Sequence, residues 1–289
     1  MPHYKVDPSW PKVLPNNWIA SVTTGIFVDS KDHIWVLNRQ RQLAEDDIGA
    51  AKTPPTQECC VPAPAVLVFD AQGNVIKSWG GQGYAHDWPV GEHGIFVDKE
   101  GNVWIGGANL PGAGNPQGLL PDRHVLKFSP DGKELLEIGH PSSAPIDNAD
   151  TTMLGAPSEI YVDDAAHEVY IADGYLNRRV VVYDSNTGAF KRGWGAYGIP
   201  LSEIDNGPRP TYDPLTPSKQ FGALSYPVRA GVVIGIDISN DGLVYVSDRG
   251  GDRVQIFTKE GKFVKEFLVH PKTLGQYGSV WSTKIGRGV

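Results

Sequence analysis

The sequence predicts an all-β protein with the architecture of a β-propeller. One pattern occurs four times along the 289 residues: an apolar stretch, a polar turn, a stretch with Trp or Tyr, V-x-x-[FY], and a second turn. Dipeptides such as Asp131-Gly132 and Asp241-Gly242 stand between runs of β-branched and aromatic residues, which is typical of hairpins. Outside 39–51, no stretch keeps the i, i+3, i+4 spacing of an amphipathic helix.

The first strand of the repeat is its clearest part, because GIFVD occurs at 25–29 and again at 94–98. The repeats span about 22–80, 92–139, 157–195 and 233–267. Each holds a core of about 40 residues, the size of a four-stranded blade. Apolar runs such as VVVY (180–183) are expected where stacked blades bury both faces of a sheet. Residues 278–289 look like the start of a truncated fifth blade, so we expect a single propeller domain over 1–289.

Composition and charge argue against some classes of function, namely nucleic-acid binding and a membrane-spanning role. The chain is 40% apolar and 20% charged, with 34 Gly and 23 Pro, which suits a soluble protein of short strands and many turns. A net charge of −7 without a Lys/Arg stripe argues against nucleic acid, since phosphate binding needs a basic surface. No apolar run reaches the roughly 18–20 residues of a membrane span. We expect no signal peptide in MPHYKVDPSWPK, and the compartment stays open.

Insertions rich in Pro, Gly and Asn interrupt the repeats at 45–64, 109–122, 142–153 and 199–229. We expect them on one face of the propeller, where loops of a rigid scaffold form ligand sites.

Cys59 and Cys60 are adjacent in the sequence, which disfavours both a disulfide and a two-cysteine zinc site. The sequence therefore predicts packed, reduced thiols.

Aromatic and histidine positions in the repeat have mostly structural interpretations. Trp79 and Trp194 are each followed by Gly, and we expect both to pack between blades. His124 and His167 fall at strand and turn positions of the repeat, and we expect them at the surface.

Four segments make the chain resemble a known family: VTTGIFVDSKDHIWVLNR (22–39), EHGIFVDKEGNVWIGG (92–107), GAPSEIYVDDAAHEVYIADGYLNRRVVVYD (155–184) and DGLVYVSDRGGDRVQIF (241–257). They are similar to the NHL repeats of six-bladed propellers. More closely, residues 4–285 resemble the peptidyl-α-hydroxyglycine α-amidating lyase (peptidylamidoglycolate lyase) domain and its bacterial relatives, which are often exported. The string ADGYxNxR around Tyr175 is the most specific match, and four of the family's six blades are covered.

The resemblance implies a metal-dependent carbon–nitrogen lyase that cleaves a peptidyl-α-hydroxyglycine into a peptide amide and glyoxylate. In the family, three histidines from separate blades hold a zinc near a tyrosine and two arginines, and calcium is a further cofactor that the resemblance implies. A Lewis acid lowers the pKa of the substrate hydroxyl. A tyrosine serves as the base if neighbouring positive charges lower its own pKa. Arginine forks suit the planar carboxylate of the substrate.

By position, His93 falls on the first zinc histidine and Tyr175 on the catalytic tyrosine. Arg39, in VLNR, and Arg249, in VSDR, fall on the two arginines. The position of the second zinc histidine is Ile234, and the third histidine belongs to a blade that this chain does not contain. Enzyme activity and zinc binding therefore stay open at this point.

Each candidate has a second interpretation. His93 either binds metal or lines the channel, and Tyr175 is either a base or an aromatic loop cover. Arg39 and Arg249 either bind a carboxylate or pair with nearby aspartates. Two functions follow: a lyase-like propeller acting on a small anionic or peptide substrate, or a non-catalytic propeller that binds a peptide or protein on its loop face.

Overall fold

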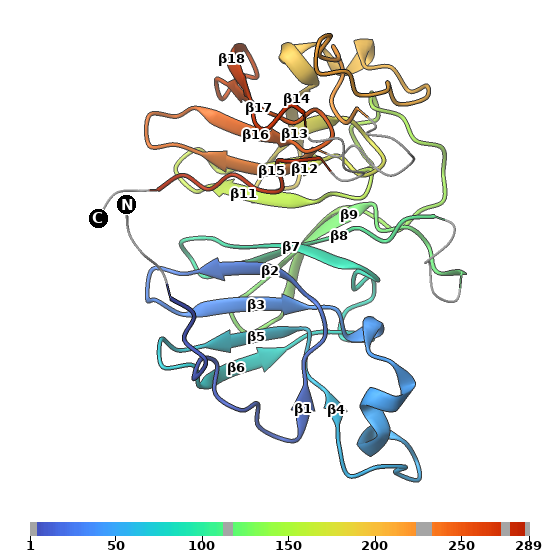
Figure 1. The fold of residues 1–289 in the computed structure, drawn as a ribbon, viewed down its shortest axis with the longest axis vertical. Helices are drawn as coiled ribbons and strands as arrows, with labels where there is room; N and C mark the ends of the chain where they lie inside the picture. Colours follow the sequence, from blue (N-terminus) through green and yellow to red (C-terminus); the bar gives the residue numbers. More distant parts are fainter. Residues whose placement is uncertain (1–4, 112–117, 224–232, 273–277, 287–289) are drawn as a thin grey trace.

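The protein is described by a computed structural model that covers residues 5–111, 118–223, 233–272 and 278–286. In this part of the chain, four antiparallel sheets of four strands follow one another in chain order (Figure 1). Their first strands, β2, β7, β11 and β15, contact one another in turn. These four strands line a central channel, as in a β-propeller. Among the residues described, no helix is long and apolar enough to cross a membrane.

The sheets cover the four repeats seen in the sequence. Blade 1 contains β2 (Thr23–Val28), β3 (Ile34–Asn38), β5 (Val66–Phe69) and β6 (Val75–Trp79). Blade 2 contains β7 (Glu92–Val97), β8 (Val103–Gly107), β9 (His124–Phe128) and β10 (Glu134–Gly139). Blade 3 contains β11 (Glu159–Asp163), β12 (Glu168–Asp173), β13 (Arg179–Asp184) and β14 (Phe190–Trp194). Blade 4 contains β15 (Val233–Ile238), β16 (Val244–Asp248), β17 (Arg253–Phe257) and β18 (Phe263–Leu268).

Short elements lie in the connections. β1 (Trp18–Ile19) and β4 (Val61–Pro62) form a parallel pair next to blade 1. The stretch 39–51, for which the sequence allows a helix, forms two 3₁₀ helices, η1 (Gln40–Gln42) and η2 (Glu45–Ala51). Two further 3₁₀ helices, η4 (Ala196–Gly198) and η5 (Leu201–Glu203), follow β14.

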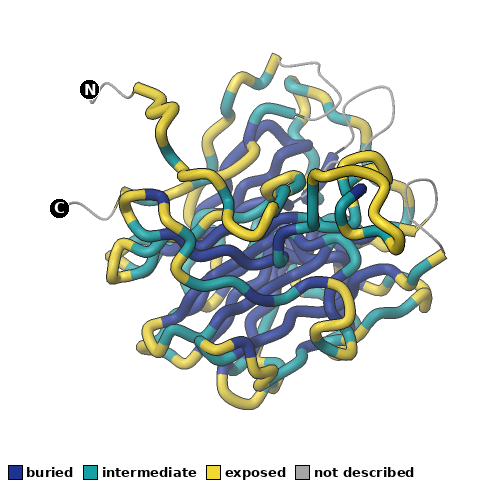
Figure 2. Tube along the Cα trace, turned by 90° about the horizontal axis from the view of Figure 1, so that it is seen from below, coloured by how far each residue is buried: buried dark blue, intermediate teal, exposed yellow. Residues whose placement is uncertain are grey.

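The apolar core lies between neighbouring blades rather than within one centre. Figure 2 shows buried residues along the strands and exposed residues mainly in the loops around them. Trp79 is buried between blades 1 and 2, and Trp194 between blades 3 and 4, so the expectation for both residues is confirmed. Gly261 explains one close contact: its φ is +86°, and a Cβ there would lie 2.5 Å from Trp194. The outer face of blade 1 is covered by Trp10, Leu14 and Trp18.

Two local predictions are wrong. Cys59 and Cys60 are joined by a disulfide. They lie in the loop between η2 and β4, outside the strand geometry that would direct neighbouring side chains to opposite faces. His124 is buried on β9 and its Nε2 lies 2.7 Å from the carbonyl oxygen of Asp87, because the loop after β6 covers this strand.

The sequence predicts residues 278–289 as the start of a fifth blade. Residues 287–289 lie outside the described part of the chain, and the segment 278–286 forms no strand. It lies along the channel side of blade 4, where the hydroxyls of Thr283 and Ser247 are 2.7 Å apart. The Ile285 amide donates to Asp237 at 2.8 Å. Side chains of blade 4 take the hydrogen bonds that a pairing strand would otherwise supply.

Buried ion pairs join the second and third strands of blades 3 and 4. Asp173 at the end of β12 accepts from Arg179 at 2.8 Å, and Asp248 at the end of β16 accepts from Arg253 at 2.8 Å. All four side chains are almost completely inaccessible to solvent. Removing one partner of such a pair leaves an uncompensated charge in the interior.

We therefore expect Asp173→Ala to lower the free energy of unfolding by about 3–5 kcal/mol, as measured by chemical denaturation. Asp131→Ala is the matched control, because Asp131 pairs with Lys77 at the surface with 90% of its side chain exposed. The control should leave the unfolding midpoint unchanged. Equal effects in the two variants would contradict a structural role for the buried pair.

Candidate functional site

A cavity of about 460 Å³ lies at one end of the channel. The beginnings of the four inner strands and the segment 281–284 form its walls. Three of the four predicted site residues line it: Arg39, His93 and Tyr175. Arg249 is close enough for its charge to act on both His93 and Tyr175. The fold therefore gathers residues from all four blades at one site.

His93 and Tyr175 are hydrogen-bonded to each other. His93 Nε2 lies 2.8 Å from the Tyr175 hydroxyl, and His93 Nδ1 lies 2.7 Å from the carbonyl oxygen of Ser158. A carbonyl oxygen only accepts, so Nδ1 carries the hydrogen and Nε2 accepts from the phenol. Burial, helped by the charge of Arg39, lowers the pKa of His93 to about 4. The imidazole is therefore neutral at pH 7 and is a proton acceptor.

Tyr175 holds its proton more tightly than an exposed tyrosine. Burial raises the pKa of its hydroxyl, and the positive charges of Arg249 and Arg39 only partly oppose this effect. The sequence interpretation required a lowered tyrosine pKa for a base. In this arrangement the phenol is instead a hydrogen-bond donor, and the acceptor of the pair is His93.

The two arginines are held in different ways. Arg39 donates from Nε to the carbonyl oxygen of Glu92 at 2.7 Å, which fixes its guanidinium beside the cavity. The guanidinium of Arg249 lies 4.6 Å from the centre of the Trp281 ring, within the range of a cation–π contact. Asp248, the acid next to Arg249 in sequence, is paired with Arg253. Arg39 lines the cavity and Arg249 adds positive charge close to it, so the site is suited to an anion.

The repeat explains why these residues meet. The second strands of blades 1, 3 and 4 end in a polar residue whose side chain accepts from the backbone leading into the same blade. The bonds are Ser21 N to Asn38 at 3.3 Å, Gly155 N to Asp173 at 2.6 Å and Gly222 N to Asp248 at 2.9 Å. Arg39 and Arg249 directly follow such an anchor, and Tyr175 follows its anchor by two residues. Equivalent anchors place them at the same level of the channel.

The cavity does not fit the three-histidine zinc site that the resemblance implies. Among the residues described that line it, His93 is the one imidazole, and Ile234 occupies the second ligand position. The carboxylate of Glu159 is already paired with Lys284. A zinc ion usually needs at least three protein ligands, and the nearby cationic side chains would repel it.

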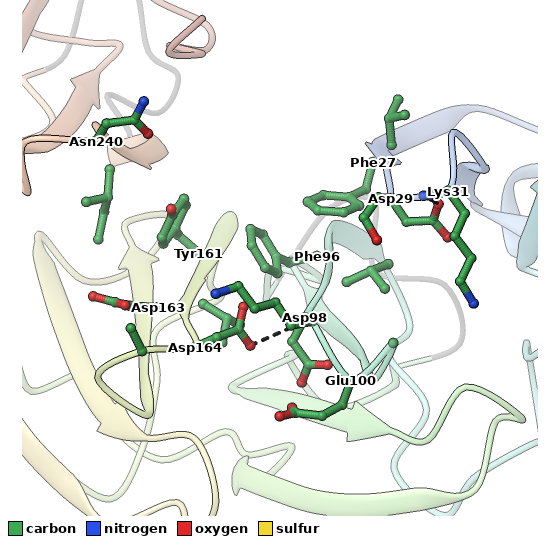
Figure 3. A pocket seen from close by; sticks show the side chains of 18 of the residues that line it. Phe27, Asp29, Lys31, Phe96, Asp98, Glu100, Tyr161, Asp163, Asp164 and Asn240 are labelled. Carbon is green, nitrogen blue, oxygen red and sulfur yellow. Dashed lines mark hydrogen bonds between the residues drawn. The ribbon is translucent and has the colours of Figure 1, made fainter. Parts of the chain in front are cut away.

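A second cavity, of about 720 Å³, opens at the other end of the inner strands (Figure 3). The rings of Phe27, Phe96 and Tyr161 lie next to one another at the equivalent position of three inner strands, with centroid distances of 4.7 and 5.2 Å. In the described part of the chain, this cavity also holds the one cluster of three or more metal-type side chains, Asp98, Glu100 and Asp164. These carboxylates are remote from the His93–Tyr175 pair and add nothing to that site.

The sequence did not predict some of the residues that form the site. The Ser158 carbonyl sets the tautomer of His93, but a backbone acceptor leaves no signature in side-chain identity. Trp281 and Lys284 form one wall of the cavity. Their position in the segment 278–289, which the sequence predicts as the start of a further blade, was the available signal.

The proteins that are similar to this chain include β-propellers and NHL-repeat proteins. No family model matches the chain. A gluconolactonase structure from Xanthomonas campestris aligns with a TM-score of 0.50 and 13% identity, covering 86% of this chain and 62% of the other. NHL repeat-containing protein 3 of Mus musculus is 26% identical over 266 residues, which are 90% of this chain and 58% of that protein. The fold is an NHL-type β-propeller.

A second relative is a much longer protein. Peptidylglycine alpha-amidating monooxygenase of Rattus norvegicus is 26% identical over 269 residues, which are 91% of this chain. The match spans 23% of that relative's length. The resemblance to the amidating proteins that the repeats indicate is thus found along nearly the whole chain.

The low pKa of His93 predicts a pH effect on stability. Its folded value of about 4 lies below the ordinary 6.5, so the unfolded chain takes up the proton first as the pH falls. The contribution of neutral His93 to the free energy of unfolding is therefore complete above about pH 6.5. As the pH falls toward 4, about 1–3 kcal/mol of this free energy is lost. We expect His93→Gln to flatten the pH dependence of the unfolding free energy in this window.

Glu92 changes the stability with pH in the opposite direction. Burial raises the pKa of its carboxyl group to about 7, so its contribution to the free energy of unfolding is lost as the pH rises. The difference between wild type and His93→Gln isolates the histidine from this background. His167→Gln, at an exposed turn, is the control. The same pH dependence in wild type and His93→Gln would contradict a neutral, buried His93.

Proposed function

We propose that the chain is a lyase-like NHL propeller that binds a small carboxylate-bearing substrate beside Arg39 and Arg249. The proposed reaction is cleavage of the carbon–nitrogen bond of a peptidyl-α-hydroxyglycine, with release of glyoxylate. The observation that carries the proposal is the His93–Tyr175 hydrogen bond at 2.8 Å next to two arginines. The match to an amidating monooxygenase over 91% of the chain supports it.

The proposed reaction needs two proton movements and no change of oxidation state. The substrate hydroxyl loses its proton as the carbon–nitrogen bond breaks, and the bonding electrons leave with the amide nitrogen. In our proposal the Tyr175 oxygen accepts the hydroxyl proton while the phenol proton moves to His93 Nε2. The same path in reverse delivers a proton to the departing nitrogen. The products are a carboxamide and an aldehyde, so atoms and charge balance.

Binding of the anion would adjust the proton acceptor. The charges of Arg39 and Arg249 contribute to the low pKa of His93. A substrate carboxylate beside them would offset part of this positive potential and raise the pKa of the imidazole. Proton transfer to His93 would therefore become easier when the correct substrate is present.

Replacement of Tyr175 tests the catalytic part of the proposal. With an α-hydroxyglycine-extended peptide as substrate, we expect Tyr175→Phe to lower kcat for glyoxylate release by about 100-fold or more. Tyr84→Phe, at a residue 44% exposed and outside the cavity, should keep the wild-type rate. Thermal unfolding of both variants checks the fold. Full turnover in folded Tyr175→Phe would show that the assignment is wrong.

A second function is favoured by the donor set of the cavity. One imidazole, with Ile234 where a second ligand is expected, suits binding of an anionic peptide end better than metal-assisted cleavage. In this alternative the same cavity holds a peptide carboxylate and releases it unchanged. Wild-type protein that binds the peptide without forming glyoxylate would favour this function over the lyase.

Arg39→Gln tests the anion site under both functions. A hydrogen bond to a charged group contributes about 1.5–3 kcal/mol, so we expect Kd or KM for the carboxylate peptide to rise about 10–100-fold. Calorimetry or initial rates would measure it. The corresponding peptide amide, which lacks the negative charge, should bind both proteins equally weakly. Unchanged affinity for the carboxylate in Arg39→Gln would place the anion elsewhere.

A further inference from the structure

Arg209 lies in the insertion between blades 3 and 4 and reaches back to the loop that carries Tyr175. Its Nη2 group lies within hydrogen-bond distance of four consecutive backbone carbonyl oxygens. The acceptors are Gly174 at 2.9 Å, Tyr175 at 3.1 Å, Leu176 at 3.4 Å and Asn177 at 3.0 Å. Its Nη1 group donates to Gly222 within the same insertion at 3.3 Å.

Four carbonyl groups that converge on one nitrogen need a positive charge at that point. Their negative ends would otherwise face one another without donors, which is costly in a partly buried loop. Burial and the neighbouring Arg178 lower the pKa of Arg209 to about 10, so the guanidinium stays charged at pH 7. Arg209 therefore supplies both the donors and the positive charge that stabilise the loop from 174 to 177 in its present shape.

The other side of this loop is also held. The amides of Tyr175 and Leu176 donate to the carbonyl oxygens of Ala156 and Gly155, at 3.4 and 2.8 Å. Gly174 is packed against the backbone of Val233 so closely that no Cβ would fit. The loop is thus fixed from blade 3, from blade 4 and from the insertion, and Arg209 supplies the contact from the insertion.

We propose that Arg209 is the positioning residue for Tyr175: it holds the loop from 174 to 177 so that the Tyr175 hydroxyl reaches His93 Nε2. This inference rests on the proposed function and extends it to an insertion that the sequence predicts as a partner-binding loop. Arg209 is not among the residues that line the cavity. It acts on the backbone of Tyr175 and not on the substrate.

Hydrogen exchange tests the contact without any substrate. We compare Arg209→Met, which keeps length and removes charge, with Arg209→Lys, which restores a compact cation. In Arg209→Met, the amides of Tyr175 and Leu176 should exchange about tenfold faster or more. In Arg209→Lys, they should stay within about threefold of wild type. Arg192→Met is the control, because Arg192 on β14 also donates to a backbone carbonyl, that of Lys259 in blade 4, and pairs with Glu168, all away from the Tyr175 loop.

Two further readouts separate positioning from general stability. The ¹⁵N signal of His93 Nε2 should shift in Arg209→Met, because Tyr175 no longer donates to it, and should return in Arg209→Lys. In the glyoxylate assay, kcat should fall about 10–100-fold with KM within about threefold, again with recovery in the lysine variant. Arg192→Met should change none of these values.

Unchanged exchange and an unchanged His93 signal in Arg209→Met would overturn the inference. So would a shifted loop with normal kcat in an enzyme that turns over. If wild type releases no glyoxylate, the proposed lyase function fails by itself. The exchange and ¹⁵N measurements then still decide whether Arg209 positions Tyr175.

Discussion

The polar side chain at the end of the second strand of a blade is the anchor on which the candidate site depends. In blades 3 and 4 this anchor is a buried aspartate that joins an arginine of the third strand to the backbone entering the blade. A buried ion pair is weak evidence for net stability, but removal of one partner is costly. Its role here is geometric, because Arg249 follows its anchor directly and Tyr175 follows its anchor by two residues along the chain.

Burial and positive charge together define what the cavity can do. The arginines and the surrounding protein keep His93 neutral, while burial keeps Tyr175 protonated. The neutral imidazole of His93 accepts a hydrogen bond from the Tyr175 phenol, and the nearby arginine charges give the cavity a positive potential that favours an anion. The same charges disfavour a metal cation, which agrees with the presence of isoleucine at position 234.

The repeats made much of the molecule predictable. GIFVD and its counterparts mark the inner strands, so the blades, the packing of Trp79 and Trp194, and the convergence of Arg39, His93 and Tyr175 follow from pattern and resemblance. Local chemistry was less predictable. The Cys59–Cys60 disulfide depends on a loop conformation, and the burial of His124 depends on a distant loop that covers its strand. Neither the disulfide nor the burial of His124 can be predicted from a local sequence pattern.

The blade architecture follows from the sequence alone, because alternating strands and turn residues are local properties of the chain. The candidate site residues follow from the resemblance of the chain to the amidating proteins. The interactions among these side chains depend on the tertiary structure. The tautomer of His93 depends on the Ser158 carbonyl of the next blade, and the proton on Tyr175 depends on burial among several strands. The position of the Tyr175 loop depends on Arg209, an arginine from a separate insertion. These properties arise from contacts between segments far apart in sequence, which no local pattern encodes.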